Sequence, residues 1–194
     1  MPSKASLPQP AGLDAIVRDG HAKRMSAVQQ LRAATAANHD AVDAAFAEVD
    51  FADPQSYGRF LIAHARALLA VEQALVSIDG LPPLRPRAAL IMDDLRALGL
   101  APPMPLPFLL SGRTSSAFGA AYVLEGSRLG GGMLAKRVGA GMPIAYLSAT
   151  HLSGEWRQFL AMLDRSAADG AWIVEAIAAA RATFDLYGSA AGSL

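Results

Sequence analysis

The sequence contains no cysteine among its 194 residues, and this absence excludes several kinds of chemistry. Disulfide bonds, thiolate metal sites and cysteine nucleophiles are all ruled out. The chain also lacks an excess of charge of either sign, because seventeen Lys and Arg residues balance seventeen Asp and Glu residues. Without a basic block, the sequence is not that of a protein whose main partner is nucleic acid.

Long hydrophobic runs are also missing. No apolar segment approaches the roughly 20 residues that a membrane-spanning helix needs, so we expect no membrane partner. Residues 1–25 contain Pro8, Pro10 and scattered charges, but they lack the apolar core of a signal peptide. We therefore expect residues 1–25 to be a flexible N-terminal leader on a soluble, cytoplasmic protein.

The remaining composition is that of a helical globular domain. Hydrophobic residues make up 53% of the chain and charged residues 18%, which is enough apolar material for a substantial core. Alanine and leucine dominate, and segments with the alternating pattern of strands are nearly absent. The sequence predicts an all-α fold over residues 26–190, a single domain of irregularly crossing helices.

Two capping signals fix the first predicted helices. Ser26 and Gln29 have the spacing of a capping box, which predicts a helix over about 26–48. Asp53 followed by Pro54 is typical of an N-cap with proline at the first helical position, and predicts a helix over about 54–78. Residues 101–113 hold four prolines and are expected to be a loop. Further helices are predicted over about 87–98, 114–138, 153–165 and 167–187.

One face of the first predicted helix is unexpectedly polar. Arg32, Thr35 and His39 lie on a stripe, at spacings of three and four, that would normally be apolar. His39 is either an ordinary helix histidine or a metal ligand. Asp43, one turn further on, is either a solvated side chain or an acceptor that orients the imidazole. His64 is predicted to be a packed or half-buried helix residue.

A glycine cluster interrupts the predicted helix over 114–138. Gly126, Gly130, Gly131 and Gly132 each cost up to about 1 kcal/mol relative to alanine in a helix, so the cluster needs a reason. One explanation is a tight helix crossing or a loop between two shorter helices. The other is a helix face without side chains that touches a large flat ligand such as haem, because Gly126 and Gly130 share one face.

Three polar residues have positions that suit a haem ligand. Arg32 precedes His39 by about 10 Å along the helix axis, at about 1.5 Å per residue, which is close to the reach from a haem iron to its propionates. Tyr122 lies one turn before Gly126, where its phenol either contacts a propionate or completes ordinary core packing. Ser127 offers a hydroxyl that can hold an ordered water.

Both segments resemble conserved motifs of the haem oxygenase family. Residues 31–39, with the pattern LRxxTxxxH, resemble the proximal-helix motif of that family. Residues 119–131, GAAYVLEGSxLGG, are very similar to the distal-helix motif of its bacterial branch. Two shorter stretches are similar to the same branch, DLxxLG at 94–99 and ARxTF at 180–184. The resemblance covers about residues 26–187.

The resemblance implies a helical bundle of the haem oxygenase type and a set of site residues. His39 would be the proximal iron ligand, with Asp43 in place of the glutamate common in the family. Gly126 and Gly130 would flank bound oxygen. The predicted haem contacts are Arg32, Thr35, His39, Tyr122, Gly126, Gly130, Gly131 and Arg181. No acidic side chain follows Gly126 in the glycine stretch, so proton delivery would rely on water, Ser127 and backbone groups.

The resemblance also implies an activity. The protein would bind haem b as cofactor and substrate, and open the ring with O2 to give biliverdin, carbon monoxide and ferrous iron. No dinucleotide-binding motif is present, so electrons would come from an external donor, a ferredoxin or a reductase. Arg128, Lys136 and Arg137 are either part of a basic docking rim or scattered surface charges.

Two alternatives to an enzyme stay open from the sequence. The same fold would serve a non-catalytic haem-binding, storage or sensor protein. A degenerate helical domain would act through protein contacts alone. If the enzyme makes biliverdin, a bilin acceptor such as a phytochrome is one partner for the product.

Overall fold

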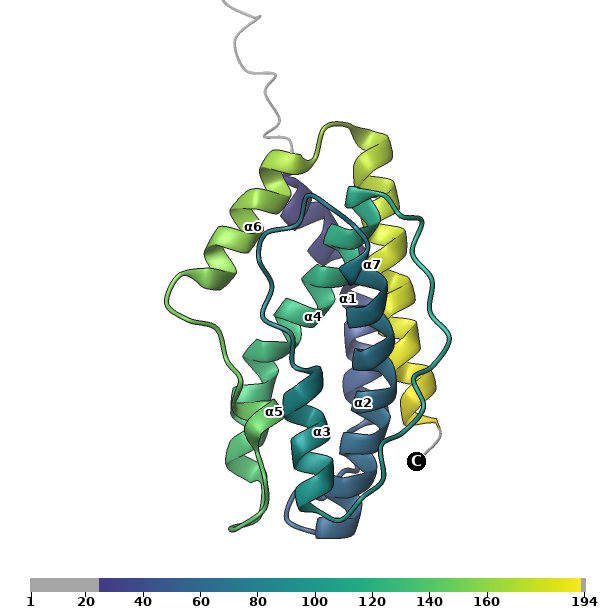
Figure 1. Cartoon of the computed structure of the whole chain (residues 1–194). Coiled ribbons are helices and arrows are strands. Elements are labelled where there is room, and N and C mark those ends of the chain that lie inside the picture. The colour runs from purple at the N-terminus through teal and green to yellow at the C-terminus, as the bar shows by residue number, and fades with distance from the viewer. Residues whose placement is uncertain (1–24, 193–194) are drawn as a thin grey trace, which may run out of the picture.

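The computed structural model describes residues 25–192, and the regular structure in that range is entirely helical (Figure 1). The prediction of an all-α fold is therefore confirmed. None of the described helices is long and apolar enough to cross a membrane. Apart from Met25, the predicted leader lies outside the described residues. The elements are α1 Ala27–Ala45, α2 Pro54–Val76, α3 Ala88–Ala97, α4 Thr114–Leu134, the 3-10 helix η1 Ala135–Arg137, α5 Ala145–Ser148, α6 Glu155–Ser166 and α7 Gly170–Ala191.

The predicted caps start the helices. Ser26 and Gln29 form the capping box at α1, with the Ser26 N–H donating to Gln29 Oε1 at 2.9 Å. Asp53 Oδ2 accepts the Ser56 N–H at 2.6 Å, and Pro54 opens α2. The sequence did not predict α5, whose four residues are too few to show a helical period.

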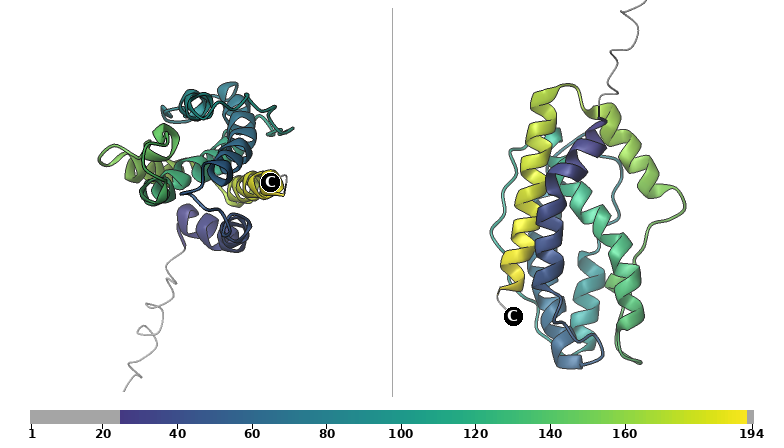
Figure 2. Two further views of the ribbon diagram at one scale, coloured as in Figure 1. Left: turned by 90° about the horizontal axis from the view of Figure 1, so that it is seen from below. Right: turned by 180° about the vertical axis from the view of Figure 1, so that it is seen from behind.

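Helix α7 is the packing centre of the molecule. It lies against α4, α1 and α2, as two further views show (Figure 2). Gly119 permits the crossing with α4, because a Cβ added there would clash with the Ala176 carbonyl of α7. The core between these helices consists of leucines, phenylalanines and many alanines, so that the backbones approach closely.

The two helices that carry the sequence motifs form separate walls. Helices α1 and α4 both lie along α7, but they make little contact with each other. Helix α6 contacts both of them, and its Asp164 Oδ1 accepts the Val28 N–H of α1 at 2.9 Å. From this end the two helices diverge (Figure 2, right). The fold thus holds α1 and α4 apart, with α7 behind them and α6 across one end.

Candidate functional site

His39 lies on the exposed face of α1, and 60% of its side chain is accessible. Its Nδ1 lies 3.3 Å from Asp43 Oδ2, as the one-turn spacing predicted, and 3.9 Å from Asp40 Oδ1. The ring also makes an edge contact with Phe184 of α7, at 5.9 Å between centroids. An imidazole that donates from Nδ1 to a carboxylate presents its Nε2 lone pair to a metal. Within residues 25–192 no cluster of three or more acidic or histidine side chains could hold a bare metal ion.

The facing side of α4 is open and apolar. Gly130 has nothing within 4 Å of an added Cβ, and Gly126 has only the edge of Trp156, at 3.9 Å. Leu129 and Met133 lie beside the glycines on the helix surface, and 53% and 68% of their surface is accessible. Since Gly126 and Gly130 do not serve a tight helix crossing, a flat apolar ligand can touch the backbone of α4 here.

The other two glycines of the cluster have a packing function. A Cβ at Gly131 would lie 2.9 Å from the Leu147 carbonyl oxygen, and one at Gly132 would lie 3.0 Å from the Thr150 side chain. These residues let the segment around α5 lie directly on α4. Close packing therefore explains Gly131 and Gly132 but not Gly126 and Gly130, for which contact with a ligand stays a prediction.

Arg32 and Tyr122 approach each other from opposite walls. Burial raises the pKa of Tyr122, and the charge of Arg32 opposes that rise, so the two side chains are electrostatically coupled. The Tyr122 ring lies 5.8 Å from the ring of Trp156 on α6. Among the described residues, Arg32 has no ion-pair partner and is exposed. An anionic ligand group can therefore be held between a guanidinium and a phenol at this end. We call the region bounded by the exposed faces of α1 and α4 the slot.

Three other predicted site residues have protein partners. The buried Thr35 hydroxyl donates to the Leu31 carbonyl at 2.8 Å, within its own helix. Arg181 donates from Nε and Nη2 to the Ala34 carbonyl, at 3.1 and 2.9 Å, and so ties α7 to α1. Ser127 Oγ donates to the Leu124 carbonyl at 2.7 Å. These contacts give each residue a structural function in addition to the predicted one.

Arg87 is a buried partner of Ser127 that the sequence did not reveal. It is 2% exposed, and its guanidinium donates to Ser127 Oγ at 2.7 Å and to the Leu124 carbonyl at 2.8 Å. The Glu72 carboxylate lies beside it and accepts the Arg87 backbone N–H at 2.7 Å. Nothing in the pattern around Arg87 marks it, because its burial depends on where α3 packs.

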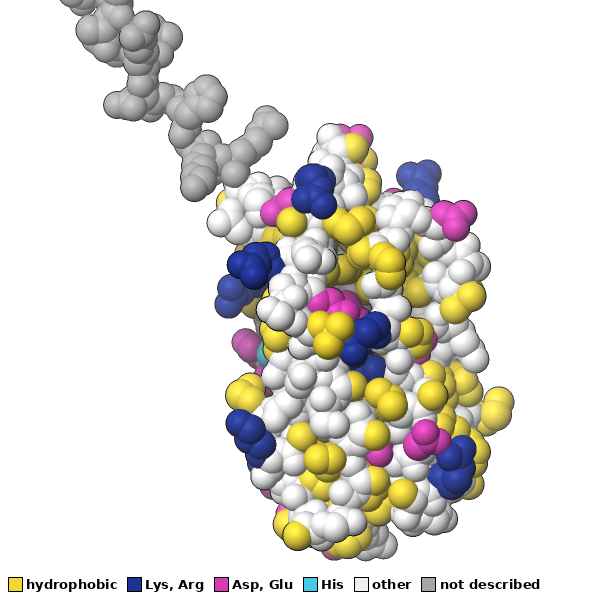
Figure 3. Space-filling model, turned by 60° about the vertical axis from the view of Figure 1, so that its left-hand side comes forward, with side chains coloured by type: hydrophobic (Ala, Val, Ile, Leu, Met, Phe, Trp, Pro, Cys, Tyr) yellow, Lys and Arg dark blue, Asp and Glu magenta, His cyan; other side chains and the backbone are white. Residues whose placement is uncertain are grey.

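Arg128 is buried, so both interpretations of it, a docking rim and a scattered surface charge, are wrong. It is 2% exposed, and its Nε donates to Glu125 Oε2 at 3.0 Å inside the fold. The same carboxylate oxygen lies 3.0 Å from His151 Nε2. Lys136 and Arg137 are exposed, as scattered surface charges. On the face drawn in Figure 3, side chains of both charge signs are dispersed among neutral and apolar ones.

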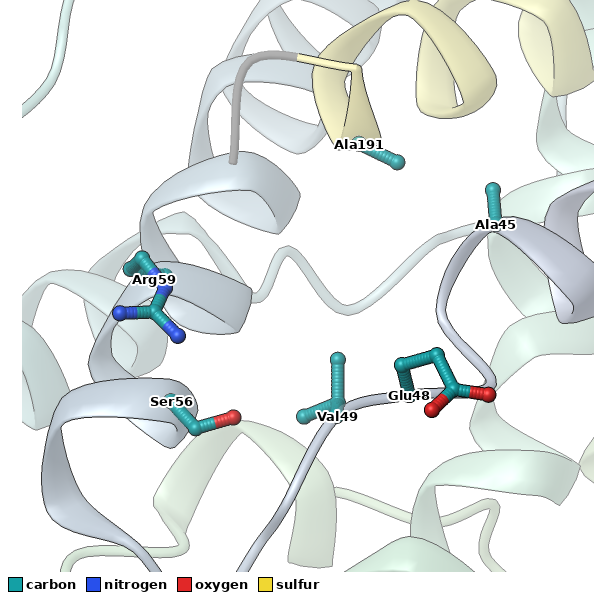
Figure 4. A pocket seen from close by; sticks show the side chains of 6 residues that line it. All are labelled: Ala45, Glu48, Val49, Ser56, Arg59 and Ala191. Carbon is teal, nitrogen blue, oxygen red and sulfur yellow. The ribbon is translucent and has the colours of Figure 1, made fainter.

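A separate pocket of about 250 Å³ lies where α1 ends (Figure 4). The Glu48 carboxylate and the Arg59 guanidinium lie on opposite sides of it. None of the predicted site residues lines this pocket. Its walls are formed by Ala45, Glu48, Val49, Ser56, Arg59 and Ala191.

Comparison with known proteins agrees with this geometry. No family model matches the chain. A protein named heme oxygenase, from Xanthomonas campestris pv. campestris (strain 8004), is 32% identical over 143 residues, which span 68% of this chain and 86% of that protein. Among solved structures, the NO- and CO-bound heme oxygenase from Neisseria meningitidis superposes with a TM-score of 0.75 at 27% identity, over 87% of this chain and 92% of that one.

A second structure shares the fold alone. Heme oxygenase from Leptospira interrogans gives a TM-score of 0.67 at 18% identity, over 88% of this chain and 100% of that one. The fold is thus that of an all-helical protein whose two motif-bearing helices, α1 and α4, lie apart against α7. The chain belongs to the haem oxygenase family.

Proposed function

We propose that this protein is an enzyme that cleaves haem b to biliverdin, carbon monoxide and ferrous iron, with O2 and external electrons. One combination of features carries the proposal. The His39–Asp43 pair is exposed on α1 and a bare face at Gly126 and Gly130 is open on α4, and both helices lie along α7. Membership of the family supports the activity.

The chemistry of the slot fits haem b. Haem is a flat, apolar disc with two carboxylates at one edge. Gly126, Gly130 and the exposed Leu129 and Met133 offer an apolar surface without protruding Cβ atoms at the glycines. Arg32 and Tyr122 offer a cation and a hydroxyl for the carboxylates. When bound, haem supplies both the iron that takes up oxygen and the ring that is oxidised.

His39 and Asp43 act as a unit in this proposal. The Asp43 carboxylate lies 3.3 Å from Nδ1, where it favours the tautomer protonated on Nδ1, leaves Nε2 for iron and helps to orient the ring. This arrangement keeps the ligand in one tautomer and makes it a stronger electron donor. Phe184 supports the ring from α7.

Proton delivery on the α4 side falls to water and neutral groups. Glu125, the only carboxylate on α4, is buried in contact with Arg128 and His151, so it is not free to donate. Ser127 and Arg87 are hydrogen bonded to each other beside Gly126. Ser127 keeps part of its surface accessible, so its hydroxyl can hold a water beside Gly126.

The proposal extends to partners. The described part of the chain contains no strand and hence no strand–glycine loop–helix unit for a dinucleotide, which supports a separate ferredoxin or reductase as the electron donor. A bilin-binding photoreceptor such as a phytochrome is one acceptor for the product.

Turnover with purified protein tests the proposal. After hemin is bound, addition of a reductant in air should remove the Soret band and produce the spectrum of biliverdin. A haem complex that survives reductant and oxygen unchanged would instead identify a storage or sensor protein. Absence of any Soret shift on titration with hemin would contradict both functions.

A further inference from the structure

Three polar rings meet inside the protein near the slot. His64 of α2 lies with Nδ1 3.0 Å from the hydroxyl of Tyr146 on α5. The His64 ring is 5.2 Å from the ring of Tyr187 on α7. We call these three residues the ring chain.

The ring chain is connected to the face of α1 that carries His39 through two aromatic residues, Phe46 and Phe184. The His64 ring packs 4.8 Å from that of Phe46, which lies on the same stripe of α1 as His39. Tyr187 follows Phe184 by one helical turn, and Phe184 contacts His39 directly. The ring chain therefore lies next to the Phe46 end of the α1 stripe, away from its Arg32 end.

All three members of the ring chain are neutral at physiological pH. Burial, followed by the charge of Arg87, lowers the pKa of His64 to about 3. Burial likewise raises the pKa of Tyr146 and of Tyr187. Each residue therefore has one proton to donate: two hydroxyls and one of the two imidazole nitrogens.

The need to give each buried O–H group an acceptor decides in which direction the hydrogen bonds of the ring chain run. The Tyr187 hydroxyl is buried and lies near that of Tyr146, but it lacks a partner in hydrogen-bond geometry. If the protons point from Tyr187 to Tyr146 to His64 Nδ1, both hydroxyls have an acceptor inside the protein, and only the His64 Nε2–H must find one elsewhere. In the reverse direction the Tyr187 O–H has no acceptor, at a cost of about 1–3 kcal/mol.

The favoured direction leaves His64 with its proton on Nε2. Among the described residues, Nε2 has no hydrogen-bond partner. The buried side-chain atoms that lack both a partner and solvent access are His151 Nδ1 and Tyr187 Oη, and Nε2 is not among them. His64 is half-buried, whereas its neighbours Ala63 and Ala65 are fully buried. Nε2 is therefore an N–H donor that faces accessible space.

We propose that His64 is a ligand-orienting residue, which donates from Nε2 to an oxygen atom of the slot's contents, and that Tyr146 fixes the tautomer this requires. The oxygen belongs to an ordered water or to an oxygen ligand held beside the porphyrin. The inference rests on the proposed function, since it takes the slot to hold haem. Tyr187 supports Tyr146 from behind.

The tautomer is tested on the protein without haem, by ¹⁵N NMR of the imidazole rings. We expect His64 to carry its proton on Nε2. Tyr146→Phe removes the donor to Nδ1 and should give a mixture of tautomers. Tyr187→Phe, the same change at another buried ring, should keep Nε2–H. A wild-type His64 protonated on Nδ1, or an unchanged tautomer in Tyr146→Phe, would overturn the proposal.

The donor function is tested with gallium(III) protoporphyrin IX, a haem analogue that does not activate oxygen. His64→Leu should bind it about tenfold more weakly, the factor expected for one net hydrogen bond. His64→Gln, which keeps an N–H donor, should bind like the wild type. Equal affinity of wild type and His64→Leu, or equal loss in both variants, would contradict the proposal. Failure of the wild type to shift the Soret band would instead refute haem binding itself.

Discussion

Nδ1 of His39 lies 3.3 Å from Oδ2 of Asp43, one turn along the same helix, while Nε2 is left free. A carboxylate at this distance favours the tautomer protonated on Nδ1. Because both residues are on α1, the contact does not depend on how α1 packs. The proposed iron-binding side of the site can therefore be tested by mutation separately from the rest.

Asp43→Ala should weaken hemin binding by about 10–100-fold, the usual effect of removing the carboxylate behind a metal-bound histidine. Titration followed at the Soret band measures it. Asp40→Ala is the matched control, because Asp40 is also exposed but lies 3.9 Å from Nδ1. Equal effects of the two changes would show that only the local charge matters.

His39→Ala should abolish turnover while leaving the fold intact, because the side chain is largely exposed. Biliverdin formation and a thermal melt measure the two properties. Added imidazole should restore part of the haem spectrum by occupying the vacated position. Normal turnover by the alanine variant would disprove iron ligation by His39.

Gly130 and Gly131 should respond in opposite ways to added side chains. Gly130→Ala has open space and should raise the unfolding free energy by up to about 1 kcal/mol through helix propensity. Gly130→Leu should bind haem but react poorly with O2. Gly131→Ala should destabilise the protein, because its Cβ would press on the Leu147 carbonyl. Urea denaturation and the yield of biliverdin measure both effects.

Arg32 and Tyr122 should share the anchoring of the haem carboxylates. Arg32→Ala and Tyr122→Phe should each weaken hemin binding, and the double variant should lose less than the sum if both hold one propionate. A changed mixture of biliverdin isomers, separated by chromatography, would report a reseated ring. Wild-type affinity in both single variants would exclude them as anchors.

His64 should make stability fall in acid. Its pKa is lowered from 6.5 to about 3 on folding, so the unfolded chain takes up a proton that the folded protein refuses. The contribution of His64 to the free energy of unfolding should therefore be fully present above pH 6.5 and should be lost as the pH falls from 6.5 toward 3. His64→Gln should flatten this dependence in urea titrations at several pH values. The same slope in both proteins would assign it to other groups.

The sequence predicted features that depend on local chemistry. The caps at Ser26 and Asp53 are set by residues three apart, and the structure contains both. Asp43 was left open between a solvated side chain and a partner of His39, and the structure places it 3.3 Å from Nδ1. Which glycines of the cluster pack against α5 and which stay open was not predictable, because this depends on α5 lying against Gly131. Arg87 was hidden for the same reason: its neighbour Ser127 is distant in the chain.

Joining α1 and α4 through α6 at one end has a mechanical consequence. Asp164 of α6 accepts a hydrogen bond at the start of α1, and Trp156 of α6 lies beside Gly126 of α4, so α6 holds the two helices together at this end. The opposite ends of α1 and α4 are not joined in this way and can separate more easily. A rigid disc should therefore enter from the far end, and the width of the opening should adapt to planar guests of different bulk without unfolding either wall.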